Sequence, residues 1–137
     1  MKTAADIMSV SPRTVSTSAT ATEAARLMRE HDIGSLPVVH NDRIVGVVTD
    51  RDLVVRVIAA GLDPDTTPVV EVASDRLVTA DASADLDEAL HLMAQHQVRR
   101  LPVVEDDRLV GVIAQADVAR LGREKQTGEL VEAVSQP

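Results

Sequence analysis

The chain has 137 residues, of which 45% are hydrophobic and 26% charged, a composition typical of a folded globular domain. Its net charge of −8 disfavours nucleic acid and anionic membrane surfaces as partners, because both are negatively charged. The absence of cysteine excludes disulfides, thiolate metal sites and a cysteine nucleophile. The sequence shows neither a secretory signal nor an apolar run long enough to cross a membrane, so a cytoplasmic location is expected.

The first predicted element is a helix over residues 20–31. Ala24, Leu27 and Met28 are spaced so that their apolar side chains share one helical face. The β-branched run at residues 36–39 then predicts a strand. A short α/β motif is therefore expected to begin here.

A hairpin and a second helix are predicted next. Asn41 and Asp42 are typical turn residues, and residues 43–49 return as a second strand. A helix is expected over residues 50–60, with Gly61 just beyond its end.

The same pattern then recurs, which is the most informative feature of the sequence. A shift of 65 positions aligns residues 33–53 with 98–118 without a gap, and 10 of these 21 positions are identical. The register extends upstream through the helix and as far as residues 6–9, which align with 71–74. The chain therefore contains two tandem copies of one structural unit.

These boundaries predict a first repeat over residues 1–62, a second over 63–123, and a tail over 124–137. A unit of about 60 residues buries little surface alone, so the repeats are expected to pack into one module. The tail contains a short amphipathic helical pattern around Leu130 and Val134. That helix would either cap the module or contact a second subunit.

The repeated motif resembles the CBS domain. It contains Leu-Pro-Val-Val at 36–39, Val-Gly at 45–46 and Thr-Asp-Arg-Asp at 49–52, and most of it recurs within 98–117. The pair is similar to a Bateman module over roughly residues 3–122. The resemblance implies an α/β fold of two β-α-β-β-α repeats, packed by pseudo-two-fold symmetry with clefts between them. It also implies dimerisation and regulatory binding of AMP, ADP, ATP or S-adenosylmethionine.

Thr49 and Asp52 are the first candidate site residues. Their spacing is that of a capping box, in which each side chain binds the backbone N–H of the other residue. In CBS pairs the matching threonine and aspartate contact a ribose. The capping role and the ribose-binding role both remain open from the sequence.

The second repeat departs from this pattern at Ala114, which replaces the threonine, while Asp117 keeps the carboxylate. A cleft that depends on Asp117 is therefore expected to be degraded.

Arg99 and Arg100 provide the opposite asymmetry, because the first repeat has Gly34 and Ser35 at these positions. The two arginines are either solvated surface residues or a phosphate clamp, since guanidinium groups pair with phosphate oxygens. The resemblance implies one competent cleft, made by Thr49, Asp52, Val78, Val98, Arg99 and Arg100.

The histidines predict no metal site. His31 and His96 are expected near helix C-termini, where a cation interacts favourably with the helix dipole. His40 and His91 have no zinc-type spacing.

Two functions are compatible with these observations. The first is a non-enzymatic, homodimeric sensor that binds an adenosine-containing ligand and signals to a partner protein. The alternative is a structural or interaction module with unused nucleotide clefts. No nucleophile elbow, phosphate-binding loop or activated acid–base pair is evident, so an enzyme is not expected.

Overall fold

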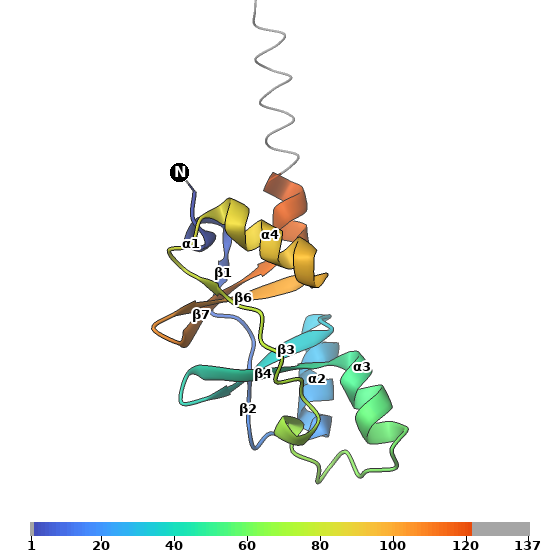
Figure 1. Ribbon diagram of the computed structural model, residues 1–137. Helices are drawn as coiled ribbons and strands as arrows, with labels where there is room; N and C mark the ends of the chain where they lie inside the picture. Colours follow the sequence, from blue (N-terminus) through green and yellow to red (C-terminus); the bar gives the residue numbers. More distant parts are fainter. Residues whose placement is uncertain (1, 122–137) are drawn as a thin grey trace, which may run out of the picture. The chain divides into compact units, whose positions relative to one another are not determined.

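The computed structural model describes residues 2–121 (Figure 1). Within this range the chain forms two compact units. The first-repeat unit contains Pro12–Leu77 and Asp106–Leu109. The second-repeat unit contains residues 2–11, Val78–Glu105 and residues 110–121. None of the helices in the described part is long and apolar enough to cross a membrane.

The first-repeat unit is a small mixed sheet with helices. Its elements are β2 (Val15–Ser16), α2 (Ala21–His31), β3 (Ser35–His40), β4 (Arg43–Thr49), α3 (Asp50–Asp52), the π-helix η1 (Leu53–Ile58) and the 3-10 helix η2 (Val69–Glu71). Strand β3 lies between β2, which is parallel to it, and β4, which is antiparallel. Strand β4 ends at Thr49, and α3 begins at the next residue, Asp50.

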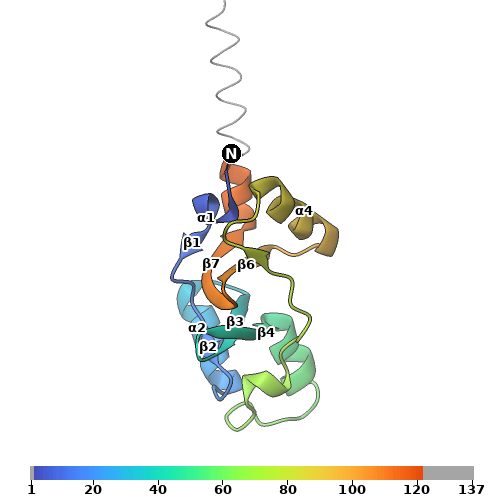
Figure 2. The ribbon, with the colours of Figure 1, turned by 60° about the vertical axis from the view of Figure 1, so that its left-hand side comes forward.

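The second-repeat unit has the same plan. Its elements are α1 (Ala4–Ile7), β1 (Ser9–Val10), β5 (Ala80–Asp81), α4 (Leu86–His96), β6 (Arg100–Glu105), β7 (Arg108–Ala114) and a helical stretch over residues 115–121. The strand order is β5-β6-β7, and β1 pairs antiparallel with β7 (Figure 2).

The long helices begin and end as their sequences predict. Thr20 accepts a hydrogen bond from the Glu23 N–H at 3.2 Å, and the Glu23 carboxylate accepts one from Thr20 N–H at 3.3 Å. Helix α2 ends before Asp32, and α4 ends before Gln97; both of these residues have left-handed backbone conformations. The predicted helix over 20–31 is confirmed to within one residue.

Both hairpins turn through two residues with positive φ. Asn41 and Asp42 have φ values of 51° and 66°, and Asp106 and Asp107 have 53° and 65°. Two consecutive residues with positive φ match the right-handed twist of the flanking strands, and Asn and Asp tolerate this conformation better than most residues. The hairpin prediction is confirmed.

The helix expected over residues 50–60 is present, but it is not a regular α-helix. One α-helical turn is followed by π-helix, in which the Ala59 N–H bonds to the carbonyl of Val54 at 2.9 Å. The run Leu-Val-Val-Arg-Val-Ile contains four β-branched residues, whose side chains crowd the preceding turn of an α-helix. This geometry buries Val57 and leaves Val54 and Ile58 exposed at 60% and 62%.

Each unit has its own aliphatic core, built from equivalent positions of the two repeats. In the first-repeat unit the fully buried strand residues are Leu36, Val38 and Val48, and in the second-repeat unit they are Leu101, Val103 and Ile113. Because the same positions are buried twice, the sequence repeat is also a repeat of packing.

The two units are not consecutive halves of the chain. The opening segment (residues 2–10) packs in the second-repeat unit, and the connecting segment (residues 67–75) packs in the first-repeat unit. The contacts are equivalent in the two units. Ser74 bridges to Val47 as Ser9 pairs with Val112, and the Val69 N–H bonds to Ala19 as the Ala4 N–H bonds to Ala84.

Candidate functional site

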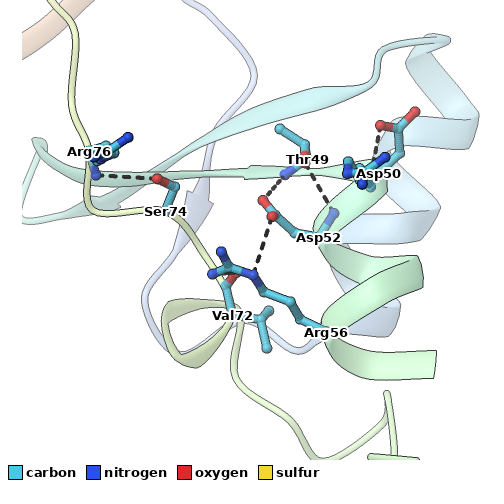
Figure 3. Close-up of polar contacts among 8 residues, drawn as sticks. Thr49, Asp50, Asp52, Arg56, Val72, Ser74 and Arg76 are labelled. Atoms are coloured by element: carbon cyan, nitrogen blue, oxygen red, sulfur yellow. Dashed lines mark hydrogen bonds and ion pairs between the residues drawn. The ribbon is translucent and has the colours of Figure 1, made fainter. Parts of the chain in front are cut away.

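The capping box at Thr49 and Asp52 is formed in the structure (Figure 3). Thr49 is the last residue of β4, and Asp52 lies in the first turn of the following helix. The Thr49 hydroxyl oxygen accepts a hydrogen bond from the Asp52 N–H at 3.1 Å, and Asp52 Oδ2 accepts one from the Thr49 N–H at 2.9 Å. These two bonds fix both side chains at the start of the helix.

The capping box leaves hydrogen-bonding capacity at both side chains. The threonine hydroxyl still has its proton to donate, and Asp52 Oδ1 still has lone pairs to accept. The Asp52 side chain is fixed by its hydrogen bond and is 15% exposed, so part of the carboxylate remains accessible to solvent. The two roles considered for this pair are therefore chemically compatible.

Arg56 is a further residue of this site that the sequence analysis did not identify. Its Nε lies 3.8 Å from Asp52 Oδ1, and its Nη1 donates a hydrogen bond to the carbonyl of Val72 at 3.3 Å. The spacing of Asp52 and Arg56 in the sequence predicts the first contact, because an arginine four residues after an aspartate on a helix commonly pairs with it. The contact with Val72 depends on tertiary structure.

The second repeat contains half of the same arrangement. The Ala114 N–H donates to Asp117 Oδ2 at 2.9 Å, but alanine offers no hydroxyl to the Asp117 N–H. Asp117 Oδ1 lies 3.7 Å from Arg120 Nη2. The carboxylate is thus positioned as in the first repeat, while the companion oxygen is missing.

The other candidate residues belong to the second-repeat unit. Arg100 opens strand β6 and is half-buried, whereas Arg99 is exposed. Val78 and Val98 are partly buried and pack against the aliphatic core of this unit. The structure therefore gathers the two arginines and the two valines in one unit, and Thr49 and Asp52 in the other.

A pocket of about 410 Å³ lies beside Arg99. It is bounded by α4 and by the helical stretch that contains Gln115 and Val118, and Val98 also lines it. Its walls combine apolar side chains with the guanidinium of Arg99 and the amides of Gln97 and Gln115.

The first-repeat unit has a pocket of about 540 Å³ at the equivalent place, between α2 and the α3–η1 helix. Arg26, Arg29 and Asp50 contribute its charged groups, and Val54 and Ile58 contribute exposed apolar surface. The two pockets differ in chemistry because the repeats differ on these helix faces.

Gly34 and Arg99 occupy equivalent positions with the same backbone role. The Gly34 carbonyl accepts from the Asp50 N–H at 2.9 Å, and the Arg99 carbonyl accepts from the Gln115 N–H at 2.8 Å. A Cβ at Gly34 would lie 3.0 Å from Asp50 Oδ2. The first repeat therefore places a carboxylate where the second has room for the arginine side chain.

The histidines lie where the sequence predicts, since His31 and His96 are in the last turns of α2 and α4. The part of the chain that the structure describes holds no cluster of three or more potential metal ligands. Hydrogen bonds from the backbone N–H of Thr3 and of Ser83 lower the pKa of Asp6 and of Asp81, respectively, and neither aspartate is a candidate site residue.

Comparison with protein families identifies the fold. The model of the CBS domain matches residues 4–59 and 69–124, which together span both repeats. The chain belongs to the CBS domain family. The predicted α/β fold of two CBS repeats is thereby confirmed, and the protein is a tandem CBS protein.

This CBS protein is similar along its whole length to hypoxic response protein 1 of Mycobacterium tuberculosis. The two are 46% identical over 138 residues, covering 100% of this chain and 96% of the relative. The crystal structure of hypoxic response protein 1, described with two coordinated zinc ions, has a TM-score of 0.80 and 48% identity. The match covers 87% of this chain and 98% of that one.

Two ligand-bound CBS structures are also similar. CBSX2 in complex with AMP has a TM-score of 0.79 and 26% identity, covering 92% of this chain and 99% of that chain. The CBS pair of protein MJ0100, in complex with 5′-methylthioadenosine and S-adenosylmethionine, has a TM-score of 0.77 and 27% identity. That match covers 91% of this chain and 98% of the other.

Proposed function

We propose that this CBS protein is a non-catalytic regulatory module that binds an adenosine-containing ligand and signals its presence to a partner protein. The observation that carries the proposal is the Thr49–Asp52 pair. Both side chains are fixed by the capping box, yet the hydroxyl proton and Asp52 Oδ1 remain available. A ribose offers vicinal hydroxyls that match these groups. The AMP-bound and S-adenosylmethionine-bound relatives support this ligand class.

The remaining candidate residues are assigned to other parts of the ligand. Arg99 and Arg100 would bind phosphate oxygens, for which the planar guanidinium is suited. Val78 and Val98 would contribute apolar contacts to the base. AMP, ADP, ATP and S-adenosylmethionine are the proposed candidates, and phosphate contacts favour the nucleotides.

A structural or interaction module is the second candidate function. It is favoured by the fact that the capping box already uses Asp52 Oδ2, and Arg56 lies beside the other carboxylate oxygen. It is also favoured by Ala114, which removes the hydroxyl from the second repeat. In this case neither carboxylate would bind a ligand.

Titration calorimetry with a matched pair of variants distinguishes the two functions. Asp52→Ala and Asp117→Ala each remove one carboxylate that caps a backbone N–H at 2.9 Å, so their structural costs are similar. The lost ribose hydrogen bonds are expected to weaken AMP binding by roughly ten- to 150-fold in Asp52→Ala, since such bonds to a charged group contribute about 1.5–3 kcal/mol. Asp117→Ala is expected to bind AMP nearly as well as the unaltered protein.

Arg100→Ala provides the test of the phosphate contact. It should weaken AMP more than adenosine, and the loss should shrink at high salt because the interaction is electrostatic. Equal losses in the two aspartate variants would contradict a site built on the first repeat. The absence of any heat with adenosine, AMP, ADP, ATP and S-adenosylmethionine would favour the structural module.

A further inference from the structure

We propose that Arg56 is a positioning residue that ties the Asp52 carboxylate to the connecting segment, so that ligand binding and docking of this segment are linked. The ligand in this proposal is the adenosine-containing ligand of the proposed function, on which the linkage rests. The connection that Arg56 makes between Asp52 and the connecting segment, called the tie below, rests only on contacts within the first-repeat unit.

The guanidinium of Arg56 faces two acceptors from different parts of the chain (Figure 3). Nε lies 3.8 Å from Asp52 Oδ1, and Nη1 donates to the Val72 carbonyl at 3.3 Å. The separate N–H groups of arginine can point at two acceptors at once, which a single lysine ammonium does less well. Arg56 therefore bridges the helix that carries Asp52 and a segment 16 residues away.

The connecting segment is itself fixed to the strand that carries Thr49. The Ser74 N–H donates to the Val47 carbonyl at 2.9 Å, and the Val47 N–H donates to the Ser74 carbonyl at 3.0 Å. Val47 is two residues before Thr49 on β4. The contacts thus form a closed path from Asp52 through Arg56 and the connecting segment back to Thr49.

Within residues 2–121 this path occurs only in the first repeat. In the second repeat Asp117 pairs with Arg120 three residues later, and the position equivalent to Arg56 is Leu121, which has no side-chain donor. The bridge therefore occurs in the repeat that also has the threonine hydroxyl.

A ligand that binds Asp52 Oδ1 acts on the same oxygen that faces Arg56. Fixing that carboxylate is expected to favour the bridging conformation of Arg56 and so the docked connecting segment. Linkage is reciprocal, so docking of the segment must strengthen ligand binding by the same factor. The expected factor is modest, about three- to tenfold, because the Arg56 side chain is 55% exposed and screened by solvent.

Amide hydrogen exchange without ligand tests the tie on its own. In Arg56→Gln, the Val47 and Ser74 amides are expected to exchange several-fold faster than in the unaltered protein. Arg120→Gln is the matched control, because it removes an aspartate-paired arginine from the other repeat, and it should leave these two amides unchanged. Equal exchange in Arg56→Gln and the unaltered protein would overturn the tie.

Titration with AMP tests the linkage. Arg56→Gln is expected to bind AMP three- to tenfold more weakly, and AMP should slow exchange at Ser74 in the unaltered protein but much less in this variant. Arg56→Lys keeps a positive charge beside Asp52 but lacks the second donor that reaches Val72, so it is expected to bind AMP nearly as weakly as Arg56→Gln, with fast exchange at Ser74. Recovery of the AMP affinity in Arg56→Lys while exchange at Ser74 stays fast would contradict the linkage, because the affinity would then depend on the charge alone.

Two failures are distinguishable in this design. If none of adenosine, AMP, ADP, ATP and S-adenosylmethionine binds the unaltered protein, the proposed function and the linkage are both contradicted, while exchange without ligand still decides whether Arg56 holds the segment. If AMP binds but does not slow exchange at Ser74, only the linkage is overturned.

Discussion

Gly46 and Gly111 illustrate how the absence of a side chain permits a tertiary contact. Each is the glycine of a Val-Gly-Val sequence on the second strand of its hairpin. A Cβ at Gly46 would lie 2.8 Å from the Ser74 carbonyl oxygen, and a Cβ at Gly111 would collide with the Met8 side chain. The repeated glycines are therefore explained by the passage of the connecting and opening segments over these strands.

We expect Gly46→Ala to lower the free energy of unfolding by about 1–3 kcal/mol, the usual cost of overpacking. The obstructing atom is backbone and is bonded to Val47, so it cannot move aside without breaking the docking of the segment. Calorimetry measures the change directly, which is convenient because the chain has no Trp or Tyr to report unfolding by fluorescence. Gly34→Ala is the control, since its Cβ would meet only the end of the exposed Asp50 side chain, and it should cost less than about 0.5 kcal/mol. Similar losses in both variants would refute this explanation.

Ala114 is a position at which a substitution is expected to stabilise the protein, because the second repeat lacks only the hydroxyl of a capping box. We expect Ala114→Thr to supply an acceptor for the Asp117 N–H and to raise the free energy of unfolding by about 0.5–1 kcal/mol. The reverse change, Thr49→Ala, should lower it by a similar amount. Thermal unfolding of the two variants and the double variant checks this expectation, which fails if Ala114→Thr is destabilising.

At the scale of elements, the π-helix decides which side chains face solvent. Leu53 and Val57 are buried, whereas Val54, Val55 and Ile58 are exposed at 60%, 49% and 62%. Exposed apolar side chains gathered on one element typically mark an interface. We therefore propose that this helix contributes to the contact between two copies of the chain.

Replacing Ile58 with Asp tests this contact. We expect Ile58→Asp to shift the protein towards monomer, because the dimer would bury a charge without a partner. Light scattering coupled to size-exclusion chromatography measures the mass. Val10→Asp is the matched control, since Val10 is 70% exposed but lies in the second-repeat unit. A monomer mass for the unaltered protein at high micromolar concentration would contradict the proposal.

At the scale of the whole molecule, the two cores depend on segments from elsewhere in the chain. Val69 of the connecting segment is fully buried in the first-repeat unit, and Ala4 of the opening segment is fully buried in the second-repeat unit. Each repeat therefore completes its core with residues that its own helix and hairpin do not provide.

We expect Val69→Ala to lower the free energy of unfolding by about 1.5–3 kcal/mol, the contribution of burying an aliphatic side chain of this size. Amide exchange should also rise first in the first-repeat unit, near Ala19 and Val47, where the connecting segment docks. The comparison is with Val70→Ala, because Val70 is 47% exposed on the same short helix and should change stability little. Exchange that rises equally in both units would argue against separate docking sites.

The sequence by itself determined the features that depend on a few neighbouring residues. The repeat, the helix over 20–31, the hairpin turns at Asn41 and Asp42, and the capping geometry of Thr49 and Asp52 were all predicted correctly. Apart from the repeat, which appears when the chain is aligned with itself, their causes are local, because periodicity, turn preference and capping act over three or four residues. The likeness of the repeats then led to the CBS family.

Only the tertiary structure decided which distant segments meet. The opening and connecting segments pack with the hairpins through backbone hydrogen bonds, which any residue except proline can donate and which therefore leave little trace in side-chain pattern. The Arg56–Val72 contact joins a side chain to such a backbone carbonyl across 16 residues. The π-helix over Leu53–Ile58 is a second example, because its altered backbone hydrogen bonds go together with the burial of Leu53 and Val57 in the core. These features follow from how the whole unit fills its core, a property that no short stretch of sequence contains.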